Sequence, residues 1–261
     1  MASLFDLSGK VAIITGSTKG IGLAIATRMA EHGATVVISS RKADACEAVA
    51  ATINAAGGKA VVIPCHIGRK DELQNLVDQT VARCGGIDIL VENAAVNPYL
   101  GPAAGMPDEA FDRVMGSNIR SNVWLANMAL PYIAQRGGGS VIIISSIGGL
   151  RGSSQLGAYA ISKAADMQVA RNIAVEWGPK NIRANAIAPG LVRTDFARAL
   201  WEDSTLYRKR TKDTPLQRIG EPDEIAGAAV FLASAAGSFT TGQTIVIDGG
   251  TTAGSVVSHD D

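Results

Sequence analysis

Short runs of aliphatic and β-branched residues alternate along this chain with longer segments of helical pattern. Seven runs are strand candidates: VAIIT (Val11–Thr15), TVVIS (Thr35–Ser39), AVVIP (Ala60–Pro64), IDILV (Ile87–Val91), SVIII (Ser140–Ile144), IRANAIA (Ile182–Ala188) and QTIVID (Gln243–Asp248). The first five are too apolar for strands that expose one face to water. They favour a parallel sheet that is covered on both faces.

Helical patterns lie between these runs, over Ile21–His32, Asp71–Cys84, Phe111–Ala134 and Ala158–Trp177. Glycines follow the first two and are expected as C-caps, whereas Pro131 is expected to end or kink the third. Alternation of strands and helices predicts right-handed crossovers. We expect α/β architecture: one domain over residues 1–261, with a doubly wound, about seven-stranded parallel sheet and helices on both faces.

The alternation of strand and helix patterns is interrupted at residues 196–215, FARALWEDSTLYRKRTKDTP. This segment combines charged residues with the aromatic residues Phe196, Trp201 and Tyr207. An insertion after the carboxyl end of a strand lies on the ligand side of such a sheet, so this segment is predicted to be a lid. A solvated surface helix with a few packing aromatics is the alternative.

Composition narrows the function classes. The chain has 24 acidic and 24 basic side chains and no net charge, which argues against a general nucleic-acid binder. No apolar run is long enough to span a bilayer, and the N-terminus lacks the apolar core of a signal peptide. Widely spaced cysteines and scattered histidines predict free thiols and no metal site; they are Cys46, Cys65, Cys84, His32, His66 and His259. We therefore expect a soluble, cytoplasmic protein.

A glycine-rich loop, TGSTKGIG, directly follows the first strand run. Glycines at this place let the chain turn tightly and bring its backbone close to a pyrophosphate, which then rests on the N-terminus of the next helix. The spacing is G-x-x-x-G-x-G rather than G-x-G-x-x-G. The loop residues expected to bind a dinucleotide are Gly16, Ser17, Lys19, Gly20, Ile21 and Gly22.

The end of the second strand bears on which dinucleotide binds. A carboxylate there would grip the ribose 2′-hydroxyl of NAD, but this chain has Ser40 and Arg41 instead. Arg41 and Lys19 are suited to a 2′-phosphate, so NADP(H) is the expected cofactor. The alternative is that Arg41 and Lys42 are only solvated charges.

Tyr159 and Lys163 are four residues apart in the last long helical pattern, so they share one helix face. The pair alone is weak, because it also fits an ordinary helix surface. Ser146 precedes it at the carboxyl end of the fifth strand run, and Asn118 lies earlier in MGSNIRSN. A capping serine and a helical asparagine are the structural alternatives for these two.

Taken in order, these motifs resemble the short-chain dehydrogenase/reductase family over residues from about 9 to 250. The matching elements are Thr15–Gly22, Asn93 with Ala94, Asn118, Ser146, Y-x-x-x-K at Tyr159–Lys163, and PGLVRT at Pro189–Thr194. The segments SSRK, CHIG, NAAVNP, RGGGSVIIISS and NIRANAIAPGLVRTDFARALW are similar to those of a subgroup of NADP-dependent carbonyl and retinal reductases. The resemblance implies a single-domain Rossmann fold.

The chemistry of the motif residues agrees with this resemblance. Reduction of a ketone needs a proton at oxygen, which Tyr159 can supply, and the adjacent ammonium of Lys163 is expected to lower the phenol's pKa from about 10. Ser146 is expected to stabilise charge on the carbonyl oxygen. The resemblance implies that Asn118 holds a water linked to Lys163, that Lys163 contacts the nicotinamide ribose, and that Thr194 contacts the carboxamide.

Further cofactor contacts are carried over from the resemblance at His66, Ile67, Asn93, Ala94, Pro189, Gly190 and Val192. Two positions depart from the family pattern. Glu92 and Ala95 stand where N-N-A-G has Asn and Gly, and we expect an effect on local stability and the adenosine side rather than on the chemistry. His66 in CHIG occupies a common Asp or Asn position, where an adenine contact and a solvated histidine are equal alternatives.

The expected function is thus NADP(H)-dependent interconversion of an alcohol and a carbonyl, namely a lipophilic ketone, an α-dicarbonyl or an aldehyde. An NAD-dependent alcohol dehydrogenase and a 3-oxoacyl thioester reductase are alternatives, the latter kept open by Arg151 and Arg193. A non-catalytic dinucleotide-binding regulator and a methyltransferase are less consistent with Ser146, Tyr159 and Lys163.

The candidate segments for the substrate pocket are residues 96–106, 147–155 and 196–215. The resemblance also implies a homotetramer built through the helices Phe111–Ala134 and Ala158–Trp177 and the last strand, whereas those apolar faces could equally belong to the monomer core.

Overall fold

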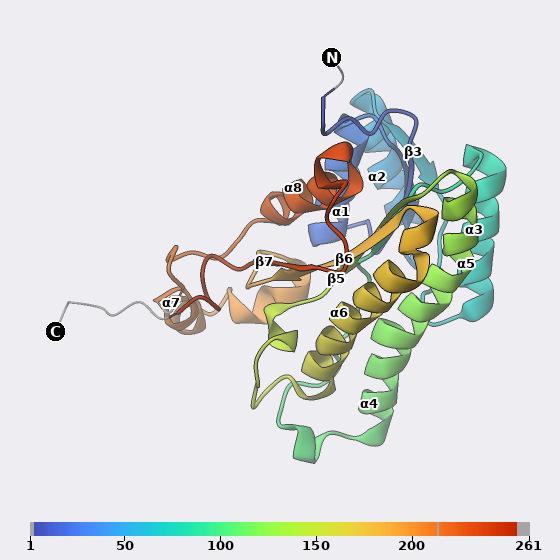
Figure 1. Ribbon diagram of the computed structural model, residues 1–261. Coiled ribbons are helices and arrows are strands. Elements are labelled where there is room, and N and C mark those ends of the chain that lie inside the picture. The colour runs from blue at the N-terminus through green and yellow to red at the C-terminus, as the bar shows by residue number, and fades with distance from the viewer. Residues whose placement is uncertain (1–2, 213, 255–261) are drawn as a thin grey trace.

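The computed structural model describes residues 3–212 and 214–254, and its centre is one parallel sheet of seven strands (Figure 1). The strand order is β3-β2-β1-β4-β5-β6-β7. The strands are β1 (Val11–Thr15), β2 (Thr35–Ser39), β3 (Lys59–Val62), β4 (Ile89–Glu92), β5 (Gly139–Ile144), β6 (Ile182–Pro189) and β7 (Thr244–Ile247). The order reverses between β1 and β4, which is where a doubly wound sheet binds its ligand. The predicted Rossmann fold is confirmed.

Helices cover both faces of the sheet (Figure 1). Helices α3 (Lys70–Cys84), α5 (Ser121–Gln135) and α6 (Gly157–Trp177) form one layer, and α4 (Asp108–Met115) extends it. Helices α1 (Gly20–Glu31), α2 (Ala43–Ala55) and α8 (Pro222–Ala233) form the other. No helix within the described residues is long and apolar enough to cross a bilayer.

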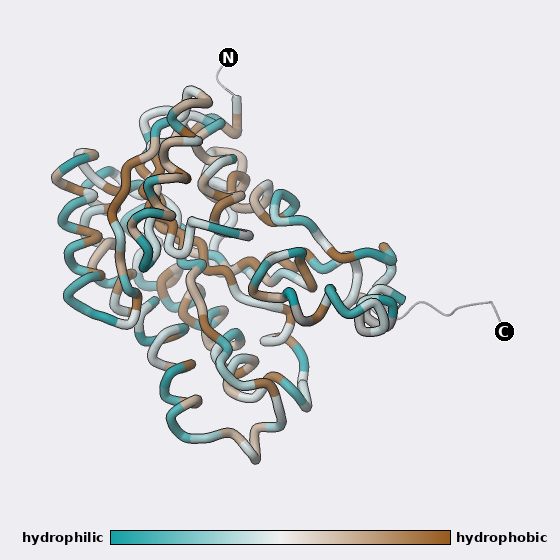
Figure 2. The backbone as a smooth tube through the Cα atoms, turned by 180° about the vertical axis from the view of Figure 1, so that it is seen from behind, coloured by the Kyte–Doolittle hydropathy of each residue, from teal (hydrophilic) through white to brown (hydrophobic). Residues whose placement is uncertain are grey.

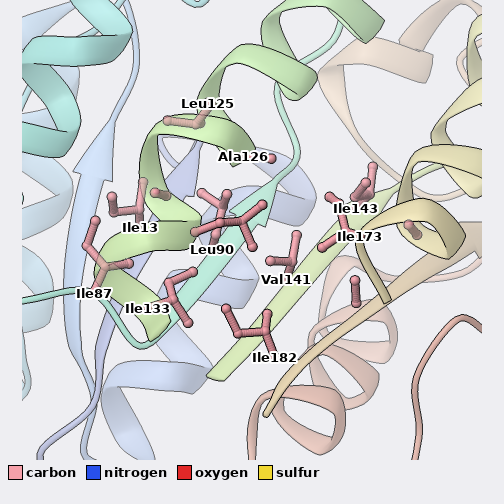
Figure 3. Packing of buried hydrophobic residues seen from close by; sticks show 14 of the residues in the cluster. Ile13, Ile87, Leu90, Leu125, Ala126, Ile133, Val141, Ile143, Ile173 and Ile182 are labelled. Atoms are coloured by element: carbon pink, nitrogen blue, oxygen red, sulfur yellow. The ribbon is translucent and has the colours of Figure 1, made fainter. Parts of the chain in front are cut away.

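The core consists of two apolar layers, one on each side of the sheet. On β4, Leu90 packs toward α5 with Leu125 and Ile133 (Figure 3), whereas Ile89 and Val91 belong to the opposite cluster. This alternation follows from the two-residue period of a strand. Hydrophobic segments accordingly run through the middle of the molecule, with hydrophilic ones mostly along the outer helices (Figure 2).

The helix predicted over Phe111–Ala134 is longer and less regular than expected. It begins at Asp108, contains a π-helical turn over Gly116–Arg120 and continues through Pro131 to Gln135. Pro131 lacks an N–H and removes one helix hydrogen bond, but the fully buried Leu130 and Ile133 hold the last turn against the core. Of the two expectations for Pro131, an end or a kink of the helix, the end is wrong, because the helix continues to Gln135.

Two helices, α2 and α8, were not named from the sequence. Helix α8 begins with a capping box formed by Glu221 and Glu224, and Pro222 occupies its first turn. The expected strand ends differ from the observed ones by at most two residues. The C-caps agree: Gly85 ends α3 in the left-handed conformation, and Gly33, also at positive φ, follows α1.

The predicted lid segment is mostly helical. It contains a 3-10 helix over Asp195–Leu200 and α7 (Ser204–Lys212), which lies far from α3 and α5 at the left of Figure 1. Its helical form agrees with the second of the two expectations.

Candidate active site

The glycine loop connects β1 to α1 at the carboxyl edge of the sheet. Gly16 and Gly20 have φ of +66° and +56°, in the region that favours glycine. A Cβ on Gly22 would lie 2.4 Å from Asn93 Nδ2 and 2.5 Å from the Gly16 carbonyl oxygen, so no side chain fits there. The loop is therefore close-packed against the end of β4.

Hydrogen bonds fix the shape of this loop. Asn93 Nδ2 donates to the carbonyl oxygens of Thr15 (2.9 Å) and Gly16 (3.3 Å), and Thr15 Oγ1 accepts from the N–H groups of Asn93 (3.0 Å) and Ala94 (3.1 Å). Ser17 is fully buried, and its Oγ accepts from the backbone N–H of Ser39 at 2.8 Å. Asn93, Ala94 and Ser17 thus shape the predicted cofactor loop.

The residues present fit a dinucleotide. The first turn of α1 carries no acidic residue, and its leading N–H groups lack partners within the helix, as an anion site requires. A Cβ on Gly20 would come within 3.1 Å of Thr194 Cγ2, so the loop and the PGLVRT segment approach each other. Arg41 at the end of β2 is exposed, and so is Lys19, whose Nζ lies 3.9 Å from Asp195 Oδ2.

The remaining predicted cofactor residues lie along the same edge. Ser40 and Ile67 are half-buried, and His66 Nδ1 accepts a hydrogen bond from the Gly68 N–H at 3.1 Å, which turns the imidazole toward its own loop. Gly190 has no room for a side chain, because a Cβ would lie 2.8 Å from Asp248. The other members of this segment are the buried Pro189 and Val192, and Thr194, which caps the 3-10 helix that follows it.

The four residues expected to carry the chemistry come together beyond this loop. Tyr159 lies in the first turn of α6, and Lys163 Nζ is 5.7 Å from the centre of its ring. Ser146 follows β5, and its Oγ accepts from the Gly148 N–H at 3.0 Å while lying close enough to the Tyr159 phenol to lower its pKa. Asn118 is fully buried on the π-helical turn.

Lys163 is almost completely buried, at 3% exposure. Its Nζ donates to the Ile144 carbonyl oxygen and to Asp166 Oδ2, both at 2.8 Å, and Asp166 Oδ1 accepts from Asn122 Nδ2 at 3.1 Å. Sequence reasoning missed Asp166 and Asn122. The position of Asp166 three residues after Lys163 on one helix was the available signal.

The pKa of the Tyr159 phenol lies above its ordinary value of 10. Burial raises it most, Lys163 and Ser146 lower it, and Asp166 raises it again. Lys163 lowers the pKa of the phenol, as expected, but the net shift is upward because burial, together with Asp166, raises the pKa more. Burial lowers the pKa of Lys163, but Asp166 and Tyr159 raise it more, so Lys163 stays cationic.

Asn118 connects the substrate side of the site to α6. Its Oδ1 accepts from the Val96 N–H at 2.9 Å, while its Nδ2 donates to the Val96 carbonyl oxygen (3.1 Å) and to Ser162 Oγ (3.0 Å). A π-helical turn often marks a functional position in a helix. The water link expected at Asn118 stays a prediction.

Glu92 lies on the lysine side of the site, a neighbourhood that the expectation for this residue did not include. It is 1% exposed at the end of β4, and among the described residues neither carboxylate oxygen has a hydrogen-bond partner. Burial and Asp166 raise its pKa well above the ordinary 4.5, and Lys163 opposes them. The charges that act on Glu92 therefore include Lys163, one of the proposed catalytic residues.

The predicted pocket segments meet near Tyr159. Gly101 N–H donates to the Gln155 carbonyl oxygen at 2.8 Å, which joins the first two segments. The ring of Phe196 lies 6.0 Å from that of Tyr159, between centres. Phe196 is 56% exposed, and the neighbouring segments expose Leu100 and Leu150. Apolar surface is thus exposed beside the phenol at Phe196 and on the neighbouring pocket segments.

Arg193 holds the segment that follows this site. Its Nε donates to Glu221 Oε1 at 2.9 Å, and its guanidinium lies 5.3 Å from the ring centre of Trp201. Trp201 Nε1 donates to the Thr194 carbonyl oxygen at 3.0 Å. Arg193 therefore has protein partners in the position where a thioester anion was considered.

No group of three or more potential metal ligands occurs in the part of the chain that the structure describes. His259 lies outside the described residues. Cys46, Cys65 and Cys84 are free thiols, as expected.

Comparisons with known proteins place these features among oxidoreductases. A family model described as enoyl-(acyl carrier protein) reductase matches residues 16–252. Dehydrogenase/reductase SDR family member 4 of Sus scrofa is 41% identical over 245 residues, which cover 94% of this chain and 88% of the relative.

Solved structures agree in fold over almost the whole chain. One is a 7 alpha-hydroxysteroid dehydrogenase complexed with NADH and 7-oxo glycochenodeoxycholic acid, with a TM-score of 0.90, 38% identity and coverage of 94% of this chain and 95% of that one. Another is a gluconate 5-dehydrogenase from Burkholderia cenocepacia J2315 in complex with NADP and tartrate, with a TM-score of 0.91, 34% identity and coverage of 95% and 97%.

Proposed function

Because this chain belongs to the short-chain dehydrogenase/reductase family, we propose that it interconverts a carbonyl and an alcohol with NADP(H) as cofactor. The observation that carries the proposal is the placement of Ser146, Tyr159 and Lys163 at the sheet edge that also holds the glycine loop. A regulator that only binds a dinucleotide would not need these three groups together.

The family uses a nicotinamide dinucleotide as cofactor, and we propose that this chain prefers the form with a 2′-phosphate, NADP(H). Solved neighbours contain NADH in one case and NADP in another, so the choice rests on this chain's own residues. No carboxylate stands at the end of β2 to repel a phosphate, and the exposed cations Arg41 and Lys19 are available to pair with one.

The cofactor supplies or accepts the hydride, and the chain's residues handle the proton and the orientation. Ser146 donates a hydrogen bond to the carbonyl oxygen, and Tyr159 gives that oxygen a proton from its phenol. Lys163 stabilises the phenolate that remains. In the oxidative direction Tyr159 takes the proton back from the alcohol.

The proposed substrates are lipophilic ketones, α-dicarbonyls or aldehydes. Leu100, Leu150 and Phe196 expose apolar surface around the site, which suits an apolar substrate. Of the two arginines that kept the 3-oxoacyl thioester alternative open, only the exposed Arg151 is left to bind an anion, since Arg193 is already bound to Glu221 and lies over Trp201. The segment 196–215 is proposed to close over the substrate as a lid.

Initial-rate assays test this function. Consumption of NADPH, and separately of NADH, is measured with aromatic ketones, α-dicarbonyls and 3-oxoacyl esters. Turnover with NADPH and an apolar carbonyl is expected. Turnover only with NADH would contradict the cofactor choice, and the absence of turnover with every compound would contradict carbonyl reduction of this class.

The active form is proposed to be a homotetramer in the cytoplasm, with each chain forming one domain. Apolar side chains are exposed on the outer layer at Phe111, Val123, Ile161 and Val175, and near β7 at Phe239 and Val246. Such surfaces are suited to contacts between copies. Sedimentation of the purified protein as a monomer at assay concentrations would contradict the tetramer.

A further inference from the structure

Glu92 is a buried carboxyl group for which the proposed reaction has no use. It is 1% exposed, and within the described ranges no donor or acceptor satisfies Oε1 or Oε2. An ionised carboxylate in such a place is costly, because nothing replaces the water it has lost. A neutral, protonated carboxyl is much less so.

The strand geometry shows what Glu92 faces. Alternate residues of a strand point to the same side, so Glu92 shares a face with Leu90, which packs against Leu125 of α5. In the sheet register Glu92 lies opposite Ile143, next to Ile144, whose carbonyl oxygen accepts from Lys163. Glu92 therefore faces the layer in which Lys163 is buried.

The groups around it are few. Helix α6 contributes the ammonium of Lys163 and the carboxyl of Asp166, and these are the charges that act on Glu92 among the described residues. Helix α5 contributes the neutral amide of Asn122, and β5 the apolar side chain of Ile143. One buried cation is thus accompanied by two buried carboxyl groups.

The two carboxyl groups, those of Asp166 and Glu92, accept different numbers of hydrogen bonds. Asp166 accepts one bond from Lys163 and one from Asn122, whereas Glu92 accepts none. We propose that the two carboxyls hold one proton, carried by Glu92, so that Lys163 faces one full negative charge and not two. Glu92 is then a positioning residue for Lys163, and only this last role rests on the proposed function.

The electrostatics support this arrangement. Burial first, and then Asp166, raise the pKa of Glu92 well above 4.5, while Lys163 opposes them without reversing the shift. An ionised Glu92 would bring a second negative charge to Lys163 and reduce the ammonium's effect on Tyr159. Its proton therefore keeps the charge of Lys163 available to the phenol.

Unfolding equilibria of the wild type and Glu92→Gln, measured from pH 4 to pH 9, test where the proton is. The folded wild type keeps a proton that the unfolded chain loses above the ordinary pKa of 4.5. Its unfolding constant should therefore rise relative to the variant's by up to tenfold per pH unit, until Glu92 ionises in the folded state. At pH 7 Glu92→Gln should be the more stable protein by at least tenfold in that constant.

Parallel curves for the two proteins would overturn the proposal. Glu176→Gln is the matched control, since Glu176 is exposed on α6 and its substitution should leave the pH dependence of the unfolding constant unchanged. A difference between the wild type and Glu92→Gln is then not explained by the loss of a surface carboxylate.

Infrared difference spectra of the wild type and Glu92→Gln supply a second measurement at pH 7. The carbonyl band of a protonated carboxyl should be present in the wild type and absent in Glu92→Gln, and a wild type without this band would also overturn the proposal.

A double-mutant cycle with Asp166→Asn tests the link to Lys163. In that variant Glu92 should ionise opposite Lys163, so the protonated band disappears and part of the activity remains. In Glu92→Gln/Asp166→Asn the ammonium has no buried counter-charge, and kcat/KM should fall at least tenfold below the product of the single effects. A double variant that equals this product would contradict the positioning role. The unfolding and infrared measurements need no substrate, so they decide the proton's location even if the proposed activity is absent.

Discussion

The Nζ atom of Lys163 lies 2.8 Å from Oδ2 of Asp166, and both side chains are buried inside the layer formed by α5 and α6. The ammonium of Lys163 therefore interacts both with the phenol of Tyr159, its proposed site of action, and with the carboxylate of Asp166. A buried charge without such a partner would lose its proton more easily. Asp166 thus keeps Lys163 cationic while weakening its influence on the phenol.

This pairing predicts the titration of Tyr159 in the protein without cofactor. Burial and Asp166 outweigh Lys163 and Ser146, so the phenol should ionise above pH 10 and stay neutral across the physiological range. Ultraviolet titration of tyrosinate in the wild type, minus that of Tyr159→Phe, isolates this group among the four tyrosines. An ionisation assigned to Tyr159 well below pH 10 would contradict the electrostatic description.

Cofactor choice should respond to the charge of Arg41. In Arg41→Asp a phosphate partner is lost and a repelling carboxylate is added, so the NADPH/NADH ratio of kcat/KM should fall by about 10- to 100-fold, the size of a charged hydrogen bond. Lys59→Asp makes the same charge change at the opposite end of the sheet and should leave the ratio as it is. An unaltered ratio in Arg41→Asp would remove the basis for NADP(H).

Phe196 should determine how well bulky apolar substrates bind. Its ring lies beside Tyr159, and Phe196→Ala removes apolar contact worth about 1.5–3 kcal/mol when fully buried. We expect KM for aromatic ketones to rise about tenfold or more and KM for small carbonyls to change little. Phe5→Ala, in the N-terminal segment, is the control. Equal changes in KM for large and small carbonyls would contradict a contact between Phe196 and the apolar part of the substrate.

The glycine loop should not tolerate a side chain at Gly22. Gly22→Ala places a Cβ at 2.4 Å from Asn93 Nδ2, so the loop or Asn93 must move. The substitution should destabilise the protein by about 1–3 kcal/mol and weaken cofactor binding. Gly227→Ala, in α8 with open space around it, should instead stabilise the protein by about 0.5–1 kcal/mol. Denaturant unfolding and cofactor titration measure both, and normal stability and cofactor binding in Gly22→Ala would show that the loop is not close-packed.

The sequence predicted the sheet well because its central strands, β1, β4, β5 and β6, are buried on both faces and read as apolar runs. The end of α5 was harder, since Pro131 is a local signal that the packing of Leu130 and Ile133 overrides. The π-helical turn that carries Asn118 has no comparable sequence signal. Boundaries of this kind depend on tertiary packing rather than on local propensity.

The site was predictable where spacing along one element fixes geometry, as it does for Tyr159 and Lys163 on α6. The role of Glu92 was not, because its relation to Asp166 depends on how β4 packs against α6. The lowering of the Tyr159 pKa by Lys163 was predicted, but the net rise of this pKa was not. It depends on the balance of burial, Lys163 and Asp166, and the motif contains only one of these.

The most direct test of the central claim is the activity of Tyr159→Phe together with its affinity for NADPH. The substitution removes only the phenolic hydroxyl, so kcat should fall by about 10²- to 10⁴-fold while the Kd for NADPH stays within a few-fold of the wild type. Tyr132→Phe on α5 is the matched control and should be fully active. Normal turnover by Tyr159→Phe would contradict the proposed role of this residue as the proton donor.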